Sequence, residues 1–389
     1  MRLYHQILAF SIAAVCATAA TASTFYSGGL WYRLTGRSTV AVAPVPADAE
    51  RNYEGVYIIP EQVFYDGYNY EVASIDDNAF CLSSATEVQI PNTVRHIGEN
   101  AFALDEALTS VTLPLHLQAI TAGMLAGTAV VNVAVPDGVK AIGEEAFQGC
   151  HQLHTVLLPA TLQEINTSCL ADCYNLYEIY CATRKVPRAT GRTPYFDGIG
   201  GVDVVLPDQS AADLYSTDAT WGDESAFTLF PDEDIDWSWP FEPEEFNASY
   251  QRVELGRNLA YRIFANDELI ALTAADHYYL PILDHDVSYT IVPTTMMGDA
   301  EPQDFVLKSP NSTSQHPIED DLGMTTPRIY AKDGVVYITG DNHGTWTQVY
   351  DCYGRLYYQR PSNDGEINGL PRNRVYIVIC GKTVKKVFL

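Results

Sequence analysis

The stretch that decides the fold is residues 90–114, IPNTVRHIGENAFALDEALTSVTLP, which returns as VPDGVKAIGEEAFQGCHQLHTVLLP at residues 135–159. Between Val72 and Cys181 one isoleucine recurs at intervals of 22, 23, 22 and 23 residues. This column consists of Ile75, Ile97, Ile120, Ile142 and Ile165. A second apolar column follows in step and consists of Phe80, Phe102, Leu125, Phe147 and Leu170. Repeats of this length predict a solenoid, in which each coil buries its apolar side only by stacking on the next coil.

Each repeat is expected to contain a short strand that ends at a proline. In the repeat that ends at Pro114, the apolar residues Val111 and Leu113 alternate with polar ones, which is the period of two that a strand shows. Proline has no amide hydrogen to give to a neighbouring strand, so it belongs at the strand's end. A second short extended piece then leads to a turn at Gly98 or Gly143.

The two quoted stretches resemble the leucine-rich repeats of the BspA type, which are found in bacterial surface proteins. An Ile-Gly-x-x-Ala-Phe core and a Leu-x-x-Val-x-Leu-Pro strand recur together in both. Residues 53–80 resemble the opening coil of that family, and residues 202–222 resemble its closing cap. The resemblance implies one leucine-rich repeat domain with both caps over residues 23–230.

The residues between the buried strand positions are expected to form two columns on one face of the ladder. The first column consists of Glu87, Ser110, Asn132, Thr155 and Glu178. The second column consists of Gln89, Thr112, Ala134, Leu157 and Tyr180. Solenoid faces of this kind commonly bind ligands, so we expect a host or environmental protein or glycan here, with first contact around Leu157, Tyr177 and Tyr180. The alternative is that both columns are ordinary solvated strand faces.

Residues 1–22 are predicted to be a secretory signal peptide. Arg2 is followed by the apolar run 7–15, and Ala20-Thr21-Ala22 supplies a cleavage site of small residues. The apolar run is far shorter than the roughly 20 residues that span a bilayer, and no other stretch is expected to form a transmembrane segment. We therefore expect a secreted protein or one on the outer cell surface. Lipid attachment at Cys16 is an alternative, although a poor lipobox precedes it.

Composition narrows the class of partner. The 389 residues carry a formal net charge of −26, and 47% of them are hydrophobic. There is room for two or three domains with packed cores. Nucleic acid and anionic lipid surfaces need clustered Lys and Arg, so no nucleic acid partner is expected.

The cysteines of the repeats are expected to be buried thiols rather than ligands. Cys150 and Cys173 take equivalent places in neighbouring repeats, where they would stack as small apolar side chains. A disulfide between them is the first alternative. A zinc site that combines Cys169, Cys173 and Cys181 with His151 and His154 is the weakest one, because the Cys-x-x-Cys spacing of structural zinc is missing. No metal and no cofactor are therefore expected.

Residues 231–246 are predicted to be an acidic linker rich in Trp and Pro, whose aromatic side chains dock on a neighbouring domain. An EF-hand loop starting at Asp232 is disfavoured, because Trp237 and Pro243 stand where such a loop needs Gly and Glu. Loose calcium binding stays open as an alternative.

Residues 247–308 return to strand patterns with a turn at Asn266-Asp267. Residues 259–293 resemble the middle of a fibronectin type III module, a small β-sandwich. A polar linker over residues 309–327 follows. The expected fold class is mainly β: a leucine-rich repeat solenoid, a fibronectin type III-like domain and a C-terminal Ig-like β-sandwich.

Residues 328–389 resemble the C-terminal sorting domain of type IX secretion cargo. The residues that would carry the sorting signal are Tyr350, Asp351, Gly354, Arg355, Tyr376, Lys382, Lys385 and Lys386. The resemblance implies that secretion machinery recognises this domain and carries the protein across the outer membrane. An ordinary Ig-like end domain without a transport role is the alternative.

The sequence contains no familiar catalytic motif: Gly-x-Ser-x-Gly, His-Glu-x-x-His and the phosphate-binding loop are all missing. His151 and His154 are expected to be solvent-exposed rather than catalytic. We therefore expect a non-enzymatic, adhesin-like binding protein with no catalytic residues. The alternative is an exported hydrolase or inhibitor that uses the repeats as a recognition arm.

Overall fold

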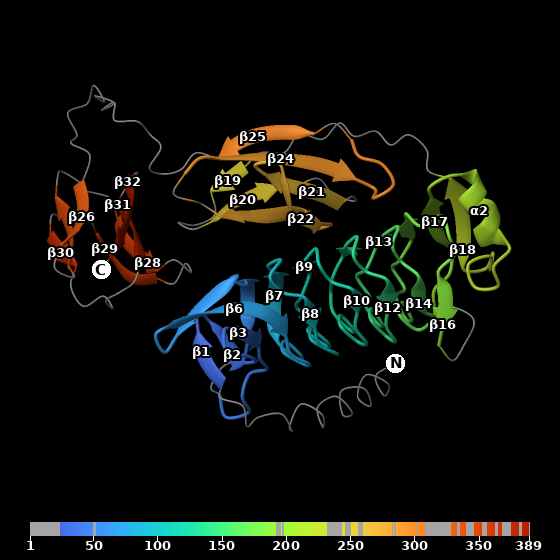
Figure 1. The fold of residues 1–389 in the computed structure, drawn as a ribbon, viewed down its shortest axis with the longest axis horizontal. Coiled ribbons are helices and arrows are strands. Elements are labelled where there is room, and N and C mark those ends of the chain that lie inside the picture. Colours follow the sequence, from blue (N-terminus) through green and yellow to red (C-terminus); the bar gives the residue numbers. More distant parts are fainter. Residues whose placement is uncertain are drawn as a thin grey trace.

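The computed structural model describes the repeats and their caps, a second domain, and the strands of a third. The described residues are 24–49, 52–191, 196, 198–231, 243–245, 250–255, 260–281, 283, 285–300, 302–307, 328–332, 335–339, 346–351, 356–361, 365–367, 375–380 and 383–388. The predicted signal peptide, most of the predicted linker 231–246 and the predicted linker 309–327 lie outside them. Figure 1 shows the coils as a continuous stack between an N-terminal cap and the helix α2.

A mainly antiparallel sheet caps the N-terminal end of the stack. Its strand order is β1-β2-β3-β6-β5, and β8 pairs with β6. The strands are β1 (Thr24–Ser27), β2 (Leu30–Leu34), β3 (Thr39–Val42), β5 (Gln62–Tyr65) and β6 (Tyr68–Ile75). Buried Phe25 and Tyr32 from this cap join the solenoid core, so the sheet closes the first coil.

The strands that end at the prolines stack in parallel along one side of the solenoid. They are β4 (Glu54–Ile58), β7 (Ser84–Gln89), β9 (Ser110–Thr112), β11 (Asn132–Ala134), β13 (Thr155–Leu158), β15 (Glu178–Cys181), β17 (Val202–Leu206) and β18 (Phe227–Pro231). They form one sheet up to β9 and another from β11 onward. Val133 pairs with Val156 and Val156 with Ile179, so equivalent repeat positions are in register. We call the outward side of β7, β9, β11, β13 and β15 the strand face.

Shorter strands carry the isoleucine column on another side of the coils. They are β8 (His96–Ile97), β10 (Ala119–Ile120), β12 (Ala141–Ile142), β14 (Glu164–Asn166) and β16 (Arg188–Thr190). Ile120 pairs with Ile142 and Ile142 with Ile165, so the column read from the sequence is a physical ladder.

The coil interior contains the predicted columns. All five isoleucines and all five residues of the Phe/Leu column are buried in one continuous core. The rings of Phe80 and Phe102 stack with centroids 5.1 Å apart. A Cβ atom at Gly98 would lie 2.3 Å from the backbone nitrogen of Asp77, which explains the glycine after the isoleucine in that repeat. The solenoid prediction is confirmed.

Cys150 and Cys173 are buried thiols that bond to the backbone. The thiol of Cys150 donates to the carbonyl of Leu125 over 3.0 Å, and the thiol of Cys173 donates to that of Phe147 over 3.1 Å. Cys150 and Cys173 are both free thiols, so the alternative disulfide between them is not formed. Burial raises the pKa of Cys150 to about 11.

The C-terminal end of the stack is closed by β17, β18 and the helix α2 (Gln209–Ser216). The carboxylate of Asp208 accepts a hydrogen bond from the amide of Ala211 over 2.9 Å and so caps the helix N-terminus. Trp221 and Tyr215 are fully buried against the last coils. These residues belong to the stretch expected to form the closing cap.

The second domain, residues 243–307, consists of two antiparallel sheets. Its strands are β19 (Pro243–Glu245), β20 (Tyr250–Glu254), β21 (Ala260–Ala265), β22 (Glu268–Thr273), β23 (His277–Pro281), β24 (Val287–Thr294) and β25 (Gln303–Leu307). The sheet orders are β19-β20-β23 and β22-β21-β24-β25. Asn266 and Asp267, with φ of 47° and 67°, form the predicted turn. β19 falls inside the expected linker 231–246 and pairs with β20, so part of that stretch belongs to the sandwich.

The strands described after residue 327 repeat this arrangement. They are β26 (Arg328–Lys332), β27 (Val335–Thr339), β28 (Trp346–Asp351), β29 (Leu356–Pro361), β30 (Gly365–Ile367), β31 (Val375–Cys380) and β32 (Thr383–Phe388). The sheet orders are β26-β27-β30 and β29-β28-β31-β32. Strand for strand, this is the order found in the second domain.

Candidate binding site

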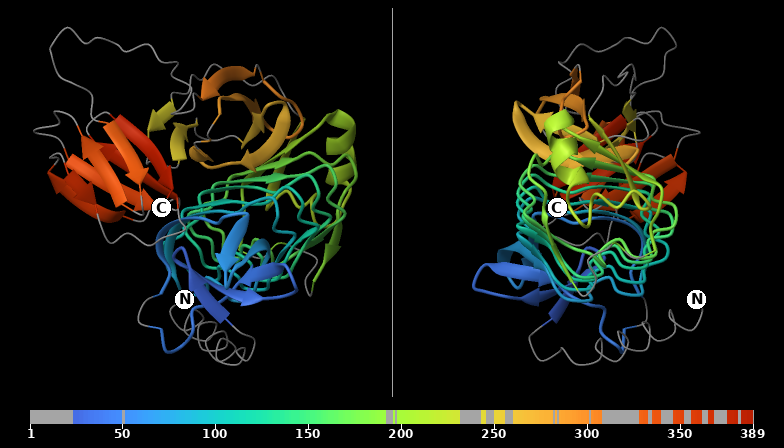
Figure 2. Two further views of the ribbon diagram at one scale, coloured as in Figure 1. Left: turned by 60° about the vertical axis from the view of Figure 1, so that its left-hand side comes forward. Right: turned by 90° about the vertical axis from the view of Figure 1, so that its right-hand side faces the viewer.

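The strand face is not open along its whole length, because the second domain packs against it. Figure 1 shows β22 and β21 beside the row of β7, β9 and β13, and the right-hand view of Figure 2 shows the second domain at one side of the stacked coils. The contacts run from β7 to β15 and involve both predicted columns. They divide into an apolar end, a middle and a polar end.

The apolar end joins the last coils to β22 and the loop after β24. Leu157 is 1% exposed and Tyr180 is 9% exposed, although both point outward from the solenoid core. They form a separate cluster with side chains of the second domain. The cluster consists of Ala134, Leu157, Tyr180 and Ala182 from the solenoid and Ala260, Leu272, Ala274 and Met296 from the second domain. Burying these apolar surfaces stabilises the docked arrangement.

In the middle of the interface, polar side chains replace the apolar ones. The hydroxyl oxygens of Thr112 and Thr273 lie 3.0 Å apart and share a hydrogen bond. The amide of Asn92 donates to the carbonyl of Ile270 in β22 over 2.8 Å. Because β22 is an edge strand, this bond satisfies a backbone group that no neighbouring strand pairs with.

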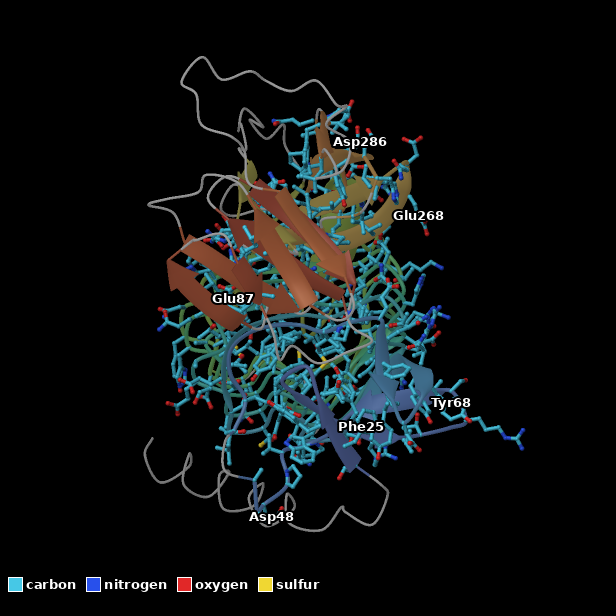
Figure 3. All side chains as sticks on the ribbon, turned by 90° about the vertical axis from the view of Figure 1, so that its left-hand side faces the viewer. Phe25, Asp48, Tyr68, Glu87, Glu268 and Asp286 are labelled. Atoms are coloured by element: carbon cyan, nitrogen blue, oxygen red, sulfur yellow. The ribbon has the colours of Figure 1, made fainter. Side chains whose placement is uncertain are left out.

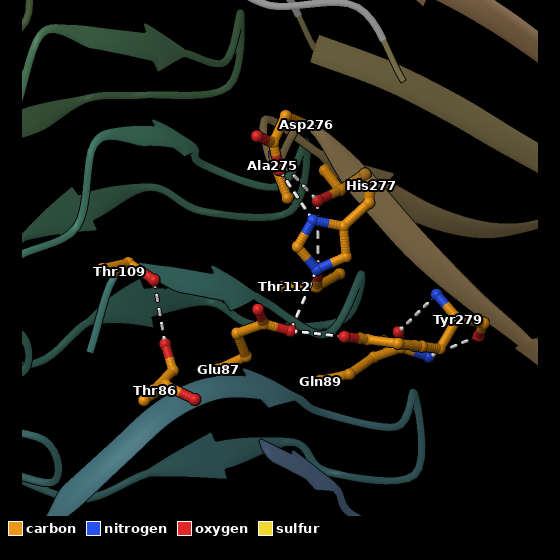
Figure 4. Close-up of polar contacts among 10 residues, drawn as sticks. Thr86, Glu87, Gln89, Thr109, Thr112, Ala275, Asp276, His277 and Tyr279 are labelled. Carbon is orange, nitrogen blue, oxygen red and sulfur yellow. Dashed lines mark hydrogen bonds and ion pairs between the residues drawn. The ribbon is translucent and has the colours of Figure 1, made fainter. Parts of the chain in front are cut away.

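The polar end consists of Glu87 and Gln89 from β7 with His277 and Tyr279 from β23 (Figure 4). One carboxylate oxygen of Glu87 accepts from His277 Nε2 over 2.9 Å and from the Tyr279 hydroxyl over 2.6 Å. Gln89 bonds twice to the backbone of Tyr279: its amide nitrogen donates to the carbonyl over 3.1 Å, and its oxygen accepts from the amide over 3.2 Å. β23 is also an edge strand, so Gln89 closes this edge as Asn92 closes the other.

The electrostatics of the polar end favour a charged pair. Burial opposes a charge on the His277 ring, which is 6% exposed, but hydrogen bonds to Glu87 and Asp276 outweigh burial and raise its pKa. For Glu87, burial alone would raise the pKa, and the bonds from His277 and Tyr279 leave it lowered. The ring donates at both nitrogens only when it is protonated, and both nitrogens face carboxylates.

The second column of predicted ligand residues is therefore an intramolecular contact. Gln89, Thr112, Ala134, Leu157 and Tyr180 all meet the second domain in this structure. The expectation that this column faces a ligand outside the chain does not fit the arrangement observed. The physical reason is that the sandwich brings its own apolar strand β22 to the same surface.

The first column is only partly covered. Glu87 is held by the polar end, and Thr155 is buried. Ser110, Asn132 and Glu178 are half-buried. Tyr177, immediately before β15, is 48% exposed and is the most open of the predicted contact residues.

Two ring pairs, one stacked and one tilted, lie beside this open part. His154 and Tyr177 have ring centroids 5.1 Å apart, and His151 and Tyr174 have centroids 5.5 Å apart with planes inclined by 10°. Each pair joins neighbouring repeats, because its members are 23 residues apart. Both histidines were expected to be solvent-exposed and are half-buried, and Tyr174 was not predicted as the ring partner of His151. The spacing of 23 residues was the signal that could have found it.

A carboxylate pair adjoins the rings. Glu178 of β15 is in register with Asp203 of β17. Burial and then the negative charge of Asp203 raise the pKa of Glu178, against a hydrogen bond with Thr155. The open end of the strand face therefore combines exposed aromatic rings with negative charge.

The residues predicted to carry the sorting signal are described only in part. The backbones of Tyr350 and Asp351 in β28 lie opposite Ile377 and Tyr376 in β31, and Lys385 and Lys386 of β32 pair with β31 on its other side. Gly354, Arg355 and Lys382 lie outside the described residues.

In the described part of the chain, no group of three or more His, Cys, Asp or Glu side chains is placed to hold a metal ion. In the same part of the chain no helix has the length and apolar character needed to cross a membrane.

Comparison with known proteins identifies the repeats. Residues 73–186 match the family model of the BspA type leucine-rich repeat region in 6 copies, one more than the five repeats read from the isoleucine column. These residues are a BspA-type leucine-rich repeat region. No curated protein matches the chain.

Three solved structures are similar to part of the chain. A leucine-rich repeat protein from Bacteroides ovatus is 19% identical, with 55% of this chain and 79% of that chain covered and a TM-score of 0.29. A leucine rich cell surface protein from Faecalibacterium prausnitzii is 21% identical, with coverage of 50% and 72% and a TM-score of 0.30. The leucine-rich repeat protein of T. pallidum is 21% identical, with coverage of 52% and 100% and a TM-score of 0.35.

Proposed function

We propose that this chain is an exported, non-enzymatic binding protein of the adhesin type, which holds a protein or glycan at the open C-terminal end of its strand face. The BspA-type repeats of residues 73–186 support a binding role, since stacked repeats present an extended surface rather than a catalytic pocket. Fold alone does not fix function, so the proposal depends on the surface itself.

The single observation that carries the proposal is the exposed ring cluster around Tyr177. The apolar column beside it is occupied by the second domain, so a ligand reaches the strand face at Tyr177 and Glu178 without displacing anything. Tyrosine rings bury a large area with little loss of side-chain freedom, and they are enriched among the residues that contribute most to binding.

The test is a glycan and host-protein array probed with the full mature chain and repeated with Tyr177→Ala. Tyr68→Ala is the matched control, because Tyr68 is 68% exposed. Figure 3 shows it in the N-terminal cap, well below Glu268 of the second domain in that view. We expect the Tyr177 variant to lose about tenfold or more in affinity, the size of a tyrosine hot spot, and the control to bind normally. If a ligand binds both variants equally, the ring cluster around Tyr177 is not its binding site and this part of the proposal is wrong.

We further propose that the second and third domains are fibronectin type III-like and Ig-like sandwiches, and that residues 328–389 direct export through type IX machinery. The shared sheet order of the two domains supports the first point, and the sequence pattern around Tyr350 and Tyr376 supports the second. Deleting residues 328–389 should retain the protein in the periplasm. Normal surface display without them would refute the sorting role.

A further inference from the structure

The second domain is attached to the strand face by an unusual pair of ends, one apolar and one ionisable. The apolar end responds little to pH, since none of its eight core members is titratable near neutrality, Tyr180 included. The polar end depends on a buried histidine that bonds to carboxylates on both sides. A contact of this kind changes strength when the ring loses its proton.

We infer that the second domain is a pH-dependent cover of the strand face, latched through Glu87 and His277, whose opening exposes the apolar surface around Leu157 and Tyr180. The latch joins the solenoid to the second domain, since Glu87 and His277 are 190 residues apart in the sequence. Opening uncovers a second, apolar surface next to the ring cluster.

The groups that face His277 come from three elements. Glu87 belongs to β7 of the solenoid, while Asp276 and Tyr279 belong to the segment that contains β23 itself. Arg252 of the neighbouring strand β20 acts in the other direction and lowers the pKa of His277. The raised pKa is the net result, in which the bonds to the two carboxylates exceed burial and Arg252 together.

The direction of the pH effect follows from the two shifts. The bond to Glu87 forms only when the domain is docked, and it raises the pKa of His277; its contribution is complete below the ordinary value of 6.5 and is lost as the pH rises through the docked pKa. Because docking lowers the pKa of Glu87, its contribution is complete above the ordinary value of 4.5 and is lost as the pH falls through the docked pKa. The cover is therefore closed most firmly between these two values and loosens in neutral to alkaline solution.

The test is hydroxyl-radical footprinting of the full mature chain from pH 5.5 to pH 8.5, which reports the solvent exposure of individual side chains. The readout is the oxidation of Tyr180 relative to Tyr177, since Tyr177 is exposed whether the cover is open or closed. We expect this ratio to rise with pH. A single linked proton limits the change in the opening constant to about tenfold per pH unit.

Three variants test whether the contact between Glu87 and His277 causes the pH-dependent exposure of Tyr180. His277→Gln should give a high ratio that no longer changes with pH. A Thr112→Cys/Thr273→Cys pair, placed where the two hydroxyl oxygens are 3.0 Å apart, should lock the cover when oxidised and give a low ratio at every pH. His96→Gln, in β8 on another side of the coils, should behave like the unaltered chain.

Unfolding is monitored in the same samples. Trp221 in the closing cap and Tyr289 in the core of the second domain are both buried and should stay unoxidised in every variant. A ratio that is constant with pH in the unaltered chain overturns the inference. So does a pH dependence that persists unchanged in His277→Gln. Neither outcome depends on whether the ring cluster binds a ligand.

Discussion

The two ends of the interface between the solenoid and the second domain differ in how easily each is recognised from the sequence and in how each responds to pH. At the apolar end, Leu157 and Tyr180 are outward-facing hydrophobic residues on a strand ladder, a conspicuous feature in any sequence. At the polar end, Glu87 and Gln89 resemble ordinary surface residues, yet they hold His277 and the backbone of Tyr279. Apolar burial supplies most of the attraction, and the polar end supplies register and pH dependence.

Two adjacent residues of β13 belong to different apolar clusters. Leu158 points inward and belongs to the solenoid core, whereas Leu157 points outward and belongs to the interface cluster. Both are 1% exposed. Exposure alone would treat them as equivalent, but they stabilise different things: one the coil stack, the other the docking of the second domain.

The largest expected effect comes from truncating these neighbours in turn. Leu158→Ala should lower the free energy of unfolding of the solenoid by about 2–5 kcal/mol, because it leaves a cavity among packed coils. Leu157→Ala should leave the solenoid's unfolding nearly unchanged and weaken docking by about 2 kcal/mol, the value of burying a leucine. Chemical denaturation followed by the oxidation of buried Trp221 measures the first effect, and Tyr180 footprinting measures the second.

Equal losses of solenoid stability in both variants would show that the outward cluster is part of one core. An unchanged Tyr180 footprint in Leu157→Ala would show that the interface at Leu157 is not formed in solution. Either result would contradict the distinction between Leu157 and Leu158.

A smaller effect is expected at the polar end, from Gln89→Ala. The change removes two hydrogen bonds to the backbone of Tyr279 and leaves an edge-strand amide and carbonyl without them. Since the groups are only partly buried and water can replace the side chain, we expect docking to weaken by about 1 kcal/mol. Footprinting of Tyr180 at pH 5.5, where the His277 latch is closed, measures the loss. The neighbouring residue Val88 is not a suitable control position for this measurement, because its side chain lies in the solenoid core and its substitution would affect the coil stack.

The fold was largely predictable from the sequence because each coil repeats the same physical requirement. Ile75 and Ile142 must fill equivalent interior positions, so selection of the same residue type every 22 or 23 residues makes the period visible. The alternation around Val111 likewise gave the strand and its inward side. These are local rules, and one sequence is enough to apply them.

The occupant of the strand face could not be predicted in the same way. Apolar outward residues such as Leu157 and Tyr180 indicate a contact surface, but the sequence does not distinguish an external ligand from a later part of the same chain. Leu272 and Ala274 in β22 carry the complementary pattern, which also suits the sandwich's own core. The partnership of Glu87 and His277 leaves no local pattern at all, since it depends on how two domains are placed.

The smallest effect on docking is expected at the rim of the interface, at an exposed ion pair. Arg262 of β21 lies 3.7 Å from Asp137 and also pairs with Asp299 of its own domain. Asp137 is largely exposed, and exposed ion pairs contribute little because water and salt screen them. Asp137→Asn should therefore change docking by less than about 0.5 kcal/mol, and added salt should remove even that difference. Tyr180 footprinting at low and high ionic strength checks both statements. A loss as large as that of Leu157→Ala would mean that charge at the rim, and not apolar burial, holds the second domain on the solenoid.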